Sequence, residues 1–221
     1  MIRLFRKALA TIRQERDERG AYMVFLMYAS HLLGLLRGLL YRVLYFANIS
    51  GFLFAMQGSS KIEIFHKRAS VRIGKFVFIR KNASLRVDYD GDLMLGDYVF
   101  INDNCNINCV NRVHIGARTK IAPNVCINDH DHDYKGVSGG RLLKGEVIIG
   151  NNVWIGSNVV VLRDTVIGDN AVIAAGSVVK GHVEPNTLFY NRRETRHIPI
   201  PSGSEAAAAA QPTPSGRGGA G

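Results

Sequence analysis

The residues best suited to chemistry form one short run, Asn-Asp-His-Asp-His-Asp-Tyr, at residues 128–134. A carboxylate beside an imidazole fixes its tautomer and raises its basicity, which suits a general base acting near neutral pH. In an extended chain alternate side chains share a face, so His130 and His132 would point one way and the three aspartates the other. The run therefore predicts two candidate bases, and an acidic solvated corner without a catalytic role is the alternative.

A metal site is a further alternative for the same run. A His-x-His pair with a third histidine, such as His114, offers the nitrogen ligands that zinc prefers. The three cysteines, Cys105, Cys109 and Cys126, form no CxxC pair, so we interpret them as buried or half-buried residues in a reducing compartment. We expect no metal.

The element that must position these residues is a six-residue repeat over residues 149–180. It reads IGNNVW, IGSNVV, VLRDTV, IGDNAV and IAAGSV, with Ile or Val opening each hexad. A period of six fits neither a helix nor a free-standing strand. Three hexads make one triangular coil, so we expect Ile149 to stack on Ile167 and Ile155 on Ile173. The repeat predicts an all-β fold, a parallel β-helix.

The repeat also sets the boundaries of the chain's parts. Hexads extend upstream to Ile73, and residues 133–148 interrupt them as an insertion at one corner, which in a compact repeat is usually functional. We divide the chain into a basic, apolar helical segment at 1–60, a β-helix domain at 61–200 and a low-complexity tail at 201–221, which we expect to be disordered.

Positive charge is concentrated in the first part of the chain. The whole sequence has 28 Lys and Arg and 18 Asp and Glu, a net charge of +10. Residues 1–86 hold 16 of these basic residues and 4 of the acidic ones. Such asymmetry indicates an anionic partner, either a phospholipid surface or a nucleic acid, and a solvated basic face is the alternative. Long aliphatic runs among the basic residues argue against nucleic acid.

The N-terminal segment reads as helix. Residues 1–19 place Ile2, Phe5, Leu9 and Ile12 on one side and basic residues on the other, as in an interfacial helix. Residues 21–56 are more apolar, but His31, Arg37 and Arg42 interrupt them, so no uncharged span of about 20 residues exists. We expect helices in the membrane interface, with peripheral contact through residues 1–56 at the inner face of the cytoplasmic membrane. A helical cap on the first coil is the alternative, and both can hold together.

Two stretches carry a family resemblance. The run IGARTKIAPNVCINDHDHDY and, after the insertion, the run IIGNNVWIGSNVVVLRDTVIGDNAVIAAGSVV resemble the hexapeptide-repeat acyltransferases. The most similar members are the maltose and galactoside acetyltransferases and the O-acetyltransferases of surface polysaccharide synthesis. The resemblance covers roughly residues 73–190. It implies a left-handed parallel β-helix, a homotrimer, and acetyl-CoA bound in the groove between neighbouring subunits.

The resemblance also assigns catalytic residues. The family's histidine stands just before the inserted loop, and counting from Ala122 and Pro123 places it at His132, with His130 ranked second. Asn102 matches the asparagine that faces this histidine across the subunit interface, where its amide would hold the acceptor or the thioester carbonyl.

A second group of residues is expected at the CoA. The resemblance places Trp154 beside the groove, Ser157, Ala174 and Ala175 along the pantetheine arm, and Lys180, Arg192 and Arg193 near the phosphates. The Gly-Pro turn that precedes the basic residues in relatives is missing here.

Together these features imply a CoA-dependent O-acyltransferase, foremost an acetyltransferase that acts on a sugar hydroxyl in cell-surface polysaccharide or lipopolysaccharide synthesis. No serine or cysteine with a partnered base is evident, which favours direct transfer. N-acetylation of an amino sugar would use the same fold and base. A zinc-dependent β-helix hydratase and a non-catalytic scaffold are the remaining alternatives.

Overall fold

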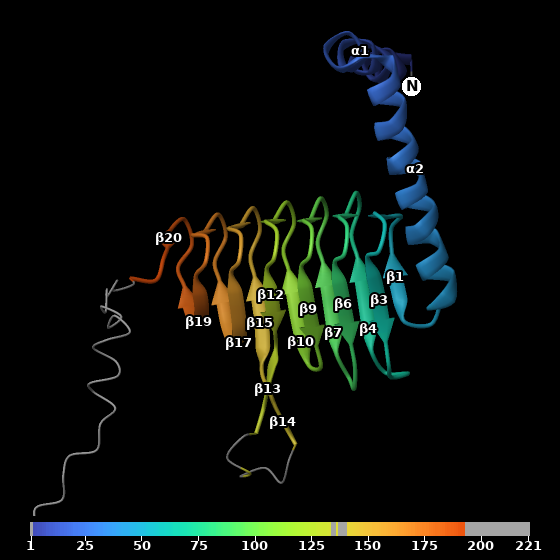
Figure 1. Cartoon of the computed structure of the whole chain (residues 1–221). Coiled ribbons are helices and arrows are strands. Elements are labelled where there is room, and N and C mark those ends of the chain that lie inside the picture. Colours follow the sequence, from blue (N-terminus) through green and yellow to red (C-terminus); the bar gives the residue numbers. More distant parts are fainter. Residues whose placement is uncertain (1, 134–135, 137–140, 193–221) are drawn as a thin grey trace, which may run out of the picture. The chain divides into compact units, whose positions relative to one another are not determined.

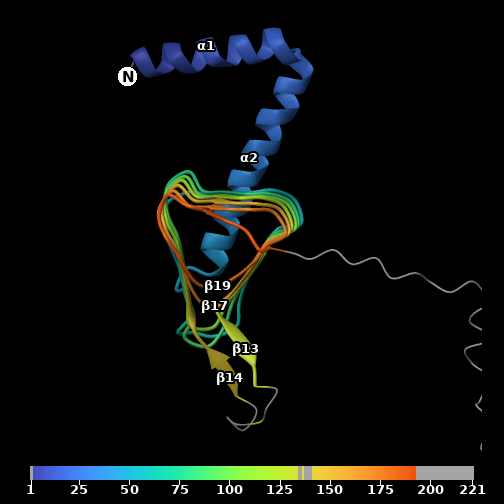
Figure 2. The ribbon, with the colours of Figure 1, turned by 90° about the vertical axis from the view of Figure 1, so that its left-hand side faces the viewer.

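The computed structural model describes residues 2–133, 136 and 141–192. Two helices precede a stack of triangular coils, and Met1–Asn191 form one compact unit. The coils are a parallel β-helix with three columns of strands (Figure 1; Figure 2). The predicted fold class is confirmed. The tail at 201–221, with its expected disorder, lies outside the described residues.

Each column contributes one face of the triangle, and its strands pair in parallel with those of the neighbouring coils. The first column holds β1 (Ile49–Gly51), β4 (Ser70–Ile73), β7 (Asp92–Leu95), β10 (Arg112–Ile115) and β15 (Glu146–Ile149). The second holds β2 (Ala55–Met56), β5 (Phe78–Ile79), β8 (Phe100–Ile101), β11 (Lys120–Ile121), β16 (Trp154–Ile155), β18 (Val172–Ile173) and β20 (Leu188–Phe189). The third holds β3 (Lys61–Ile64), β6 (Ser84–Val87), β9 (Asn106–Cys109) and β12 (Cys126–Asn128). Two longer strands, β17 (Val160–Ile167) and β19 (Val178–Val183), turn a corner and join the third column to the first.

The first residue of each hexad points into the coil, as the repeat predicts. Ile149 pairs in register with Ile167, and Ile155 pairs with Ile173. All four side chains are buried. Stacked aliphatic side chains of equal size pack without gaps, so the ladder supplies the apolar burial that stabilises the fold.

The coils begin earlier in the chain than the hexads suggested. The first coil opens at Ile49, whereas the sequence placed the start of the β-helix domain at residue 61 and helices up to residue 56. Phe54 and Met56 are buried and belong to the core. The position that pairs with the hexad opener Ile73 is an exposed glycine, Gly51, and it stands five residues before Met56, whereas Met56 stands six before Ile62. The repeat is therefore hidden in this coil.

The segment before the coils forms two helices, α1 (Ile2–Arg19) and α2 (Ala21–Leu44). Gly34 and Gly38 of α2 are buried against the first coil, and Tyr41 packs on the core. The helical cap, which the sequence offered as the alternative to helices in the membrane interface, is therefore present. The structure also shows that α2 is long and apolar enough to cross a membrane by length and composition. The side chains of Ile2, Phe5 and Leu9 lie outside those described.

Candidate active site

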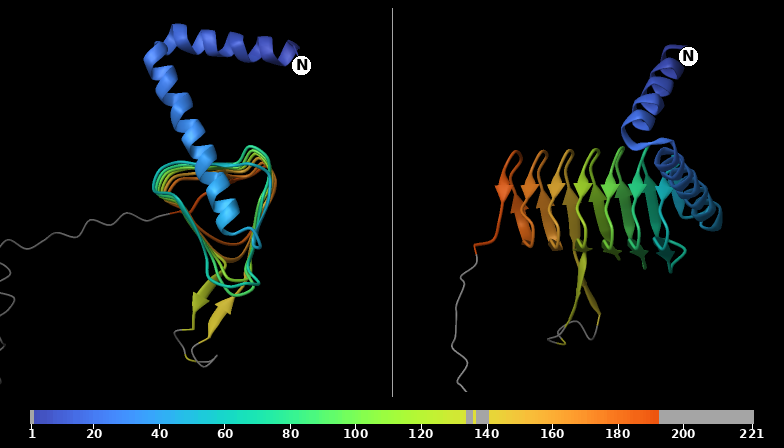
Figure 3. Two further views of the ribbon diagram at one scale, coloured as in Figure 1. Left: turned by 90° about the vertical axis from the view of Figure 1, so that its right-hand side faces the viewer. Right: turned by 45° about the horizontal axis from the view of Figure 1, so that its top comes forward.

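Both candidate bases lie on a strand that leaves the coil. At the end of β12 the chain turns outward as β13 (His130–His132), which pairs antiparallel with β14 (Leu142–Lys144), His130 opposite Lys144 (Figure 1; Figure 3). A hairpin arm therefore stands at the corner where the insertion was predicted at 133–148, but with different bounds. Its first strand begins at His130, and residues 146–148 belong to coil strand β15. Tyr134, the last residue of the histidine-rich run, lies outside the described residues.

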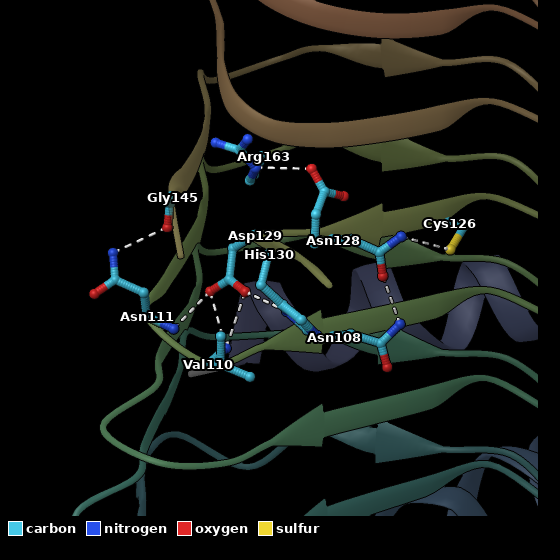
Figure 4. A network of polar contacts seen from close by, with 10 residues as sticks. Asn108, Val110, Asn111, Cys126, Asn128, Asp129, His130, Gly145 and Arg163 are labelled. Atoms are coloured by element: carbon cyan, nitrogen blue, oxygen red, sulfur yellow. Dashed lines mark hydrogen bonds and ion pairs between the residues drawn. The ribbon is translucent and has the colours of Figure 1, made fainter. Parts of the chain in front are cut away.

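Asp129 anchors the base of this arm (Figure 4). Its carboxylate is fully buried and accepts hydrogen bonds from the backbone N–H groups of Val110, at 2.9 and 3.0 Å, and Asn111, at 2.7 Å. It also lies 2.9 Å from Nδ1 of His130. A carboxylate held by two backbone donors has a fixed position, so it orients the His130 ring and leaves Nε2 on the other side.

The side chains on β13 alternate as the sequence predicts. His130 and His132 both line one hollow of about 710 Å³. Asp131, between them, points elsewhere and accepts a hydrogen bond from Nε of Arg163 at 2.7 Å. The ion pair ties the arm to β17, which steadies the strand that carries both imidazoles.

The hollow also gathers basic and aromatic side chains from the third column and the arm. Arg86, Asp88, Tyr89, Asn108, Arg141 and Lys144 are among its lining residues. Lys144 Nζ lies over the Tyr89 ring, 4.5 Å from its centroid. The hydrogen bond from Arg86 at 2.9 Å is the main reason that the pKa of Glu63 is lowered. With Glu63 counted as the partner of Arg86, the basic residues Arg86, Arg141 and Lys144 still outnumber the acidic residues Glu63 and Asp88, so the wall favours an anionic or strongly polar ligand.

Asn102 lies in a second hollow, on another face of the same chain. This hollow, of about 480 Å³, lies on the second column and includes Trp154 and Ser157. Phe100, Lys120, Ile121, Ala122 and Pro123 complete its lining. One predicted catalytic residue and two predicted cofactor residues therefore come together, apart from the histidines. Within a single chain, Asn102 does not share a hollow with the histidines.

The remaining predicted cofactor residues are less closely grouped. Ala174 is half-buried and Ala175 exposed at the corner after β18, while Lys180 is exposed on β19. Neither alanine lines the hollow around Trp154. Arg192 is exposed, and Arg193 lies outside the described residues.

His114 does not join the histidines of the arm. It lies on β10, in the first column, where Nε2 is 2.8 Å from Oδ2 of Asp92, and Arg72 binds the same oxygen at 2.7 Å. Among the residues that the structure describes, no three His, Cys, Asp or Glu side chains gather as a metal site. The suggested zinc set of His130, His132 and His114 is therefore not assembled.

Two of the three cysteines are unsuited to covalent catalysis. Cys105 and Cys109 are buried and Cys126 is half-buried, all as thiols. Burial raises the pKa of the Cys105 and Cys109 thiols, so the nucleophilic thiolate is disfavoured at neutral pH.

Sequence reasoning missed the cationic wall of the first hollow. Arg86 pairs in register with Asn108, and Asn108 with Asn128, so these residues stack at one position of successive coils. Counting one coil at a time back from Asn128 would have led to Arg86 if every coil had the same number of residues. The irregular stretch DYDGD at residues 88–92 changes the number of residues between coils.

Comparisons with known proteins agree with this architecture. Residues 146–181 match the family model described as bacterial transferase hexapeptide, six repeats. The chain is 34% identical to galactoside O-acetyltransferase of Escherichia coli over 128 residues, which cover 55% of this chain and 63% of the relative. It is 37% identical over 110 residues to WbbJ of the same species, named as a candidate lipopolysaccharide biosynthesis O-acetyltransferase, with 45% and 56% covered. The matched region spans less than two thirds of the length of both relatives.

A solved structure shows the same fold at lower identity. AntD, an N-acyltransferase from Bacillus cereus, in complex with dTDP and 3-hydroxybutyryl-CoA, superposes with a TM-score of 0.56 at 17% identity, over 67% of this chain and 81% of that one. The chain therefore contains hexapeptide repeats within a parallel β-helix and is similar to galactoside O-acetyltransferase and to WbbJ, as its sequence predicts.

Proposed function

We propose that this protein is a CoA-dependent acyltransferase that moves an acetyl group from acetyl-CoA to a sugar hydroxyl. The observation that carries the proposal is the pair of imidazoles on β13, which line a polar hollow beside an insertion in a hexapeptide-repeat β-helix. Similarity to named O-acetyltransferases supports the reaction class. A role in cell-surface polysaccharide or lipopolysaccharide synthesis is part of the same proposal.

The imidazole acts as general base in a direct transfer. It takes the proton from the acceptor hydroxyl while the oxygen attacks the thioester carbonyl carbon, and backbone N–H groups stabilise the oxyanion. The tetrahedral intermediate collapses with cleavage of the carbon–sulfur bond, and the CoA thiolate leaves with the proton that the imidazolium held. No covalent acyl-enzyme is needed, in keeping with the buried thiols of Cys105 and Cys109.

We assign the base to His132 and a positioning role to His130. The resemblance places the catalytic histidine at His132, which lies further out on the arm and is exposed. His130 is held through Nδ1 by buried Asp129, an arrangement that fixes the ring and with it the start of the arm.

The two hollows suggest how the site is completed. Asn102, Trp154 and Ser157 lie on the second column, and the histidines project from the corner beside the third. We infer that a neighbouring copy in a homotrimer brings its Asn102 face to the arm, with acetyl-CoA held in the groove between them. A groove shared by two chains supplies both proximity and exclusion of water.

The proposal is tested first by binding of acetyl-CoA to the full chain, followed by calorimetry. Truncation at residue 61 would remove β1 and β2 of the first coil, so the whole chain is used. We expect one site per chain with a Kd between about 1 μM and 1 mM. If the folded protein binds no acetyl-CoA at concentrations several times the upper end of that range, the proposal is contradicted.

Transfer to a panel of sugars then tests the roles of the histidines. His132→Ala should lower kcat by about 10²-fold or more, the usual loss when a general base is removed, and leave acetyl-CoA binding intact. His130→Ala should cost less. If His130→Ala instead causes the larger loss, the base is His130. Mass and linkage analysis of the product separates O-acetylation from N-acetylation.

A further inference from the structure

Helix α2 exposes a continuous apolar stripe along its whole length. The stripe comprises Tyr22, Phe25, Leu32, Leu36, Leu40 and Val43, at helical intervals of three, four or seven, and each is between 55% and 67% exposed. Ala29 fills the gap of seven. No charged residue lies within this outer stripe. Contiguous exposed apolar surface of this kind marks a contact site.

The opposite side of α2 is already occupied. Gly38 fits so closely on the first coil that an added Cβ would lie 2.0 Å from the carbonyl oxygen of Phe54, and Gly34 and Tyr41 continue the contact. Arg37 reaches the carbonyl of Gln57. The outer stripe therefore points away from the β-helix, and the coils do not cover it.

Exposed aromatic rings gather on the coils nearest α2. Phe76 and Tyr98 stack at 5.2 Å at one corner, with Phe52 beside Phe76 at 6.2 Å. At the same corner of later coils stand Arg118, Asn152, Asn170 and Asn186. All six corner residues from Phe76 onward have positive φ, a conformation that suits Asn and is unfavourable for an aromatic residue. The corner conformation therefore does not explain why aromatic residues stand there. The rings pack on one another, yet Phe52, Phe76 and Tyr98 all remain exposed, so they add apolar surface to the first coils.

The charge of this region is complementary to anionic headgroups. Helix α1 carries Arg3, Arg6, Lys7, Arg13, Arg16 and Arg19 against Glu15, Asp17 and Glu18, and it connects directly to the first turn of α2 through Gly20. Basic residues beside an apolar helical face are the usual composition of an interfacial helix.

We propose that the outer stripe of α2 and the aromatic rings of the first coils seat this protein on an anionic phospholipid bilayer, with α2 in the plane of the interface. The apolar side chains enter the acyl boundary and α1 contacts the headgroups. In a parallel trimer every copy presents α2 at the same end, so three weak contacts act together. This inference does not depend on the proposed transferase activity.

An in-plane helix fits better than a transmembrane one, although the length of α2 permits a span. Residues 34–44 have one side on the first coil, so lipid cannot surround them. The part before them, residues 21–33, is about 20 Å long at 1.5 Å per residue, shorter than a hydrocarbon core of about 30 Å.

The test is flotation of the full chain with vesicles, either of phosphatidylcholine alone or with phosphatidylglycerol added. We expect binding to the anionic vesicles, and weaker binding when salt rises from about 0.1 M to about 1 M. The double variant Leu36→Glu/Leu40→Glu should weaken binding by about tenfold or more, because two carboxylates would enter the apolar boundary.

Two control variants show whether weaker vesicle binding comes from lost lipid contact, from misfolding or from the added negative charge alone. Leu36→Met/Leu40→Met should bind as the unaltered protein does. Val166→Glu, on an exposed strand position of β17, should also bind. Circular dichroism and urea denaturation, both measured without lipid, establish that each variant is folded.

Several results would overturn the proposal. The proposal is excluded if the unaltered chain does not float with anionic vesicles. It is also excluded if the glutamate variant is folded and floats as well as the unaltered chain. If the glutamate variant instead reduces the mass of the assembly in solution while no vesicles bind, the outer stripe is a contact between copies and the bilayer proposal is wrong.

Discussion

At the scale of single residues, Asp129 links the coil to the arm. Its carboxylate is buried and accepts hydrogen bonds from two backbone N–H groups, and it lies beside the His130 ring. A buried carboxylate without these partners would be costly, and the backbone at Val110 and Asn111 would lose its acceptor. Asp129 therefore serves both the stability of the corner and the orientation of His130.

Replacing Asp129 tests this double role. Asp129→Asn keeps the shape but presents one oxygen and one amide donor to three donors, so we expect the free energy of unfolding to fall by about 1–3 kcal/mol. Urea denaturation measures this. Asp131→Asn breaks the partly exposed ion pair with Arg163 and should change stability by less than about 1 kcal/mol. Equal effects of the two variants would contradict the assignment.

The buried thiols make stability depend on alkaline pH. An unfolded cysteine has a pKa of about 8.5, while burial raises the pKa of Cys109 and Cys105 in the folded protein. The unfolded chain then loses its thiol protons first, so stability is retained below about pH 8.5 and is lost as the pH rises above it.

Two measurements check the thiol prediction. The urea concentration at the unfolding midpoint should decrease when the pH is raised from 7 to above the pKa of an unfolded cysteine. Cys109→Ala should make that decrease smaller. Ellman's reagent should label half-buried Cys126 ahead of the two buried thiols. Labelling of all three cysteines at one rate in the folded protein would be inconsistent with their burial.

At the scale of elements, α2 owes its seat on the first coil to its glycines. Gly in a helix interior usually costs about 1 kcal/mol relative to Ala. At Gly38 the missing Cβ allows the backbone to approach the carbonyl of Phe54, and at Gly34 that of Met56. Close approach thus compensates for the poor helix propensity of these positions.

Alanine at Gly38 and alanine at the unpacked Gly58 should affect stability differently. Gly38→Ala should destabilise the protein by about 1–3 kcal/mol, because the added methyl group would overlap the Phe54 carbonyl and push α2 away. Gly58→Ala, where an added Cβ meets nothing within 4 Å, should be close to neutral. Thermal denaturation compares them. A more stable Gly38→Ala variant would show that propensity outweighs the contact.

At the scale of the whole molecule, the arrangement of the two hollows predicts a site shared between copies. Asn102 and His132 line separate hollows of one chain. If neighbouring chains complete each site, two inactive variants can complement each other. A site built within one chain has no such property.

Mixing variants tests the sharing. His132→Ala and Asn102→Ala should each be inactive alone. Co-refolded at equal amounts into random trimers, they should recover about a quarter of the activity of the unaltered protein, since one site in four joins an intact histidine to an intact asparagine. No recovery in mixed trimers confirmed by mass would place both residues in one chain's site.

The repeating core and its register could be predicted from the amino-acid sequence. A six-residue period leaves one inward aliphatic per hexad, so the stacking of Ile149 on Ile167 follows from counting alone. It also predicted the insertion and the alternation of His130, Asp131 and His132, because strand periodicity is local.

The neighbours of these residues became known only once the coils were placed against one another. The start of the coils at Ile49 was hidden by unequal spacing, and the cationic wall from Arg86 by an irregular corner at residues 88–92. The bond between Asp129 and the backbone of Val110, and the separation of Asn102 from the histidines, depend on which coils and faces meet. Such contacts join residues distant in sequence, and no local pattern specifies them.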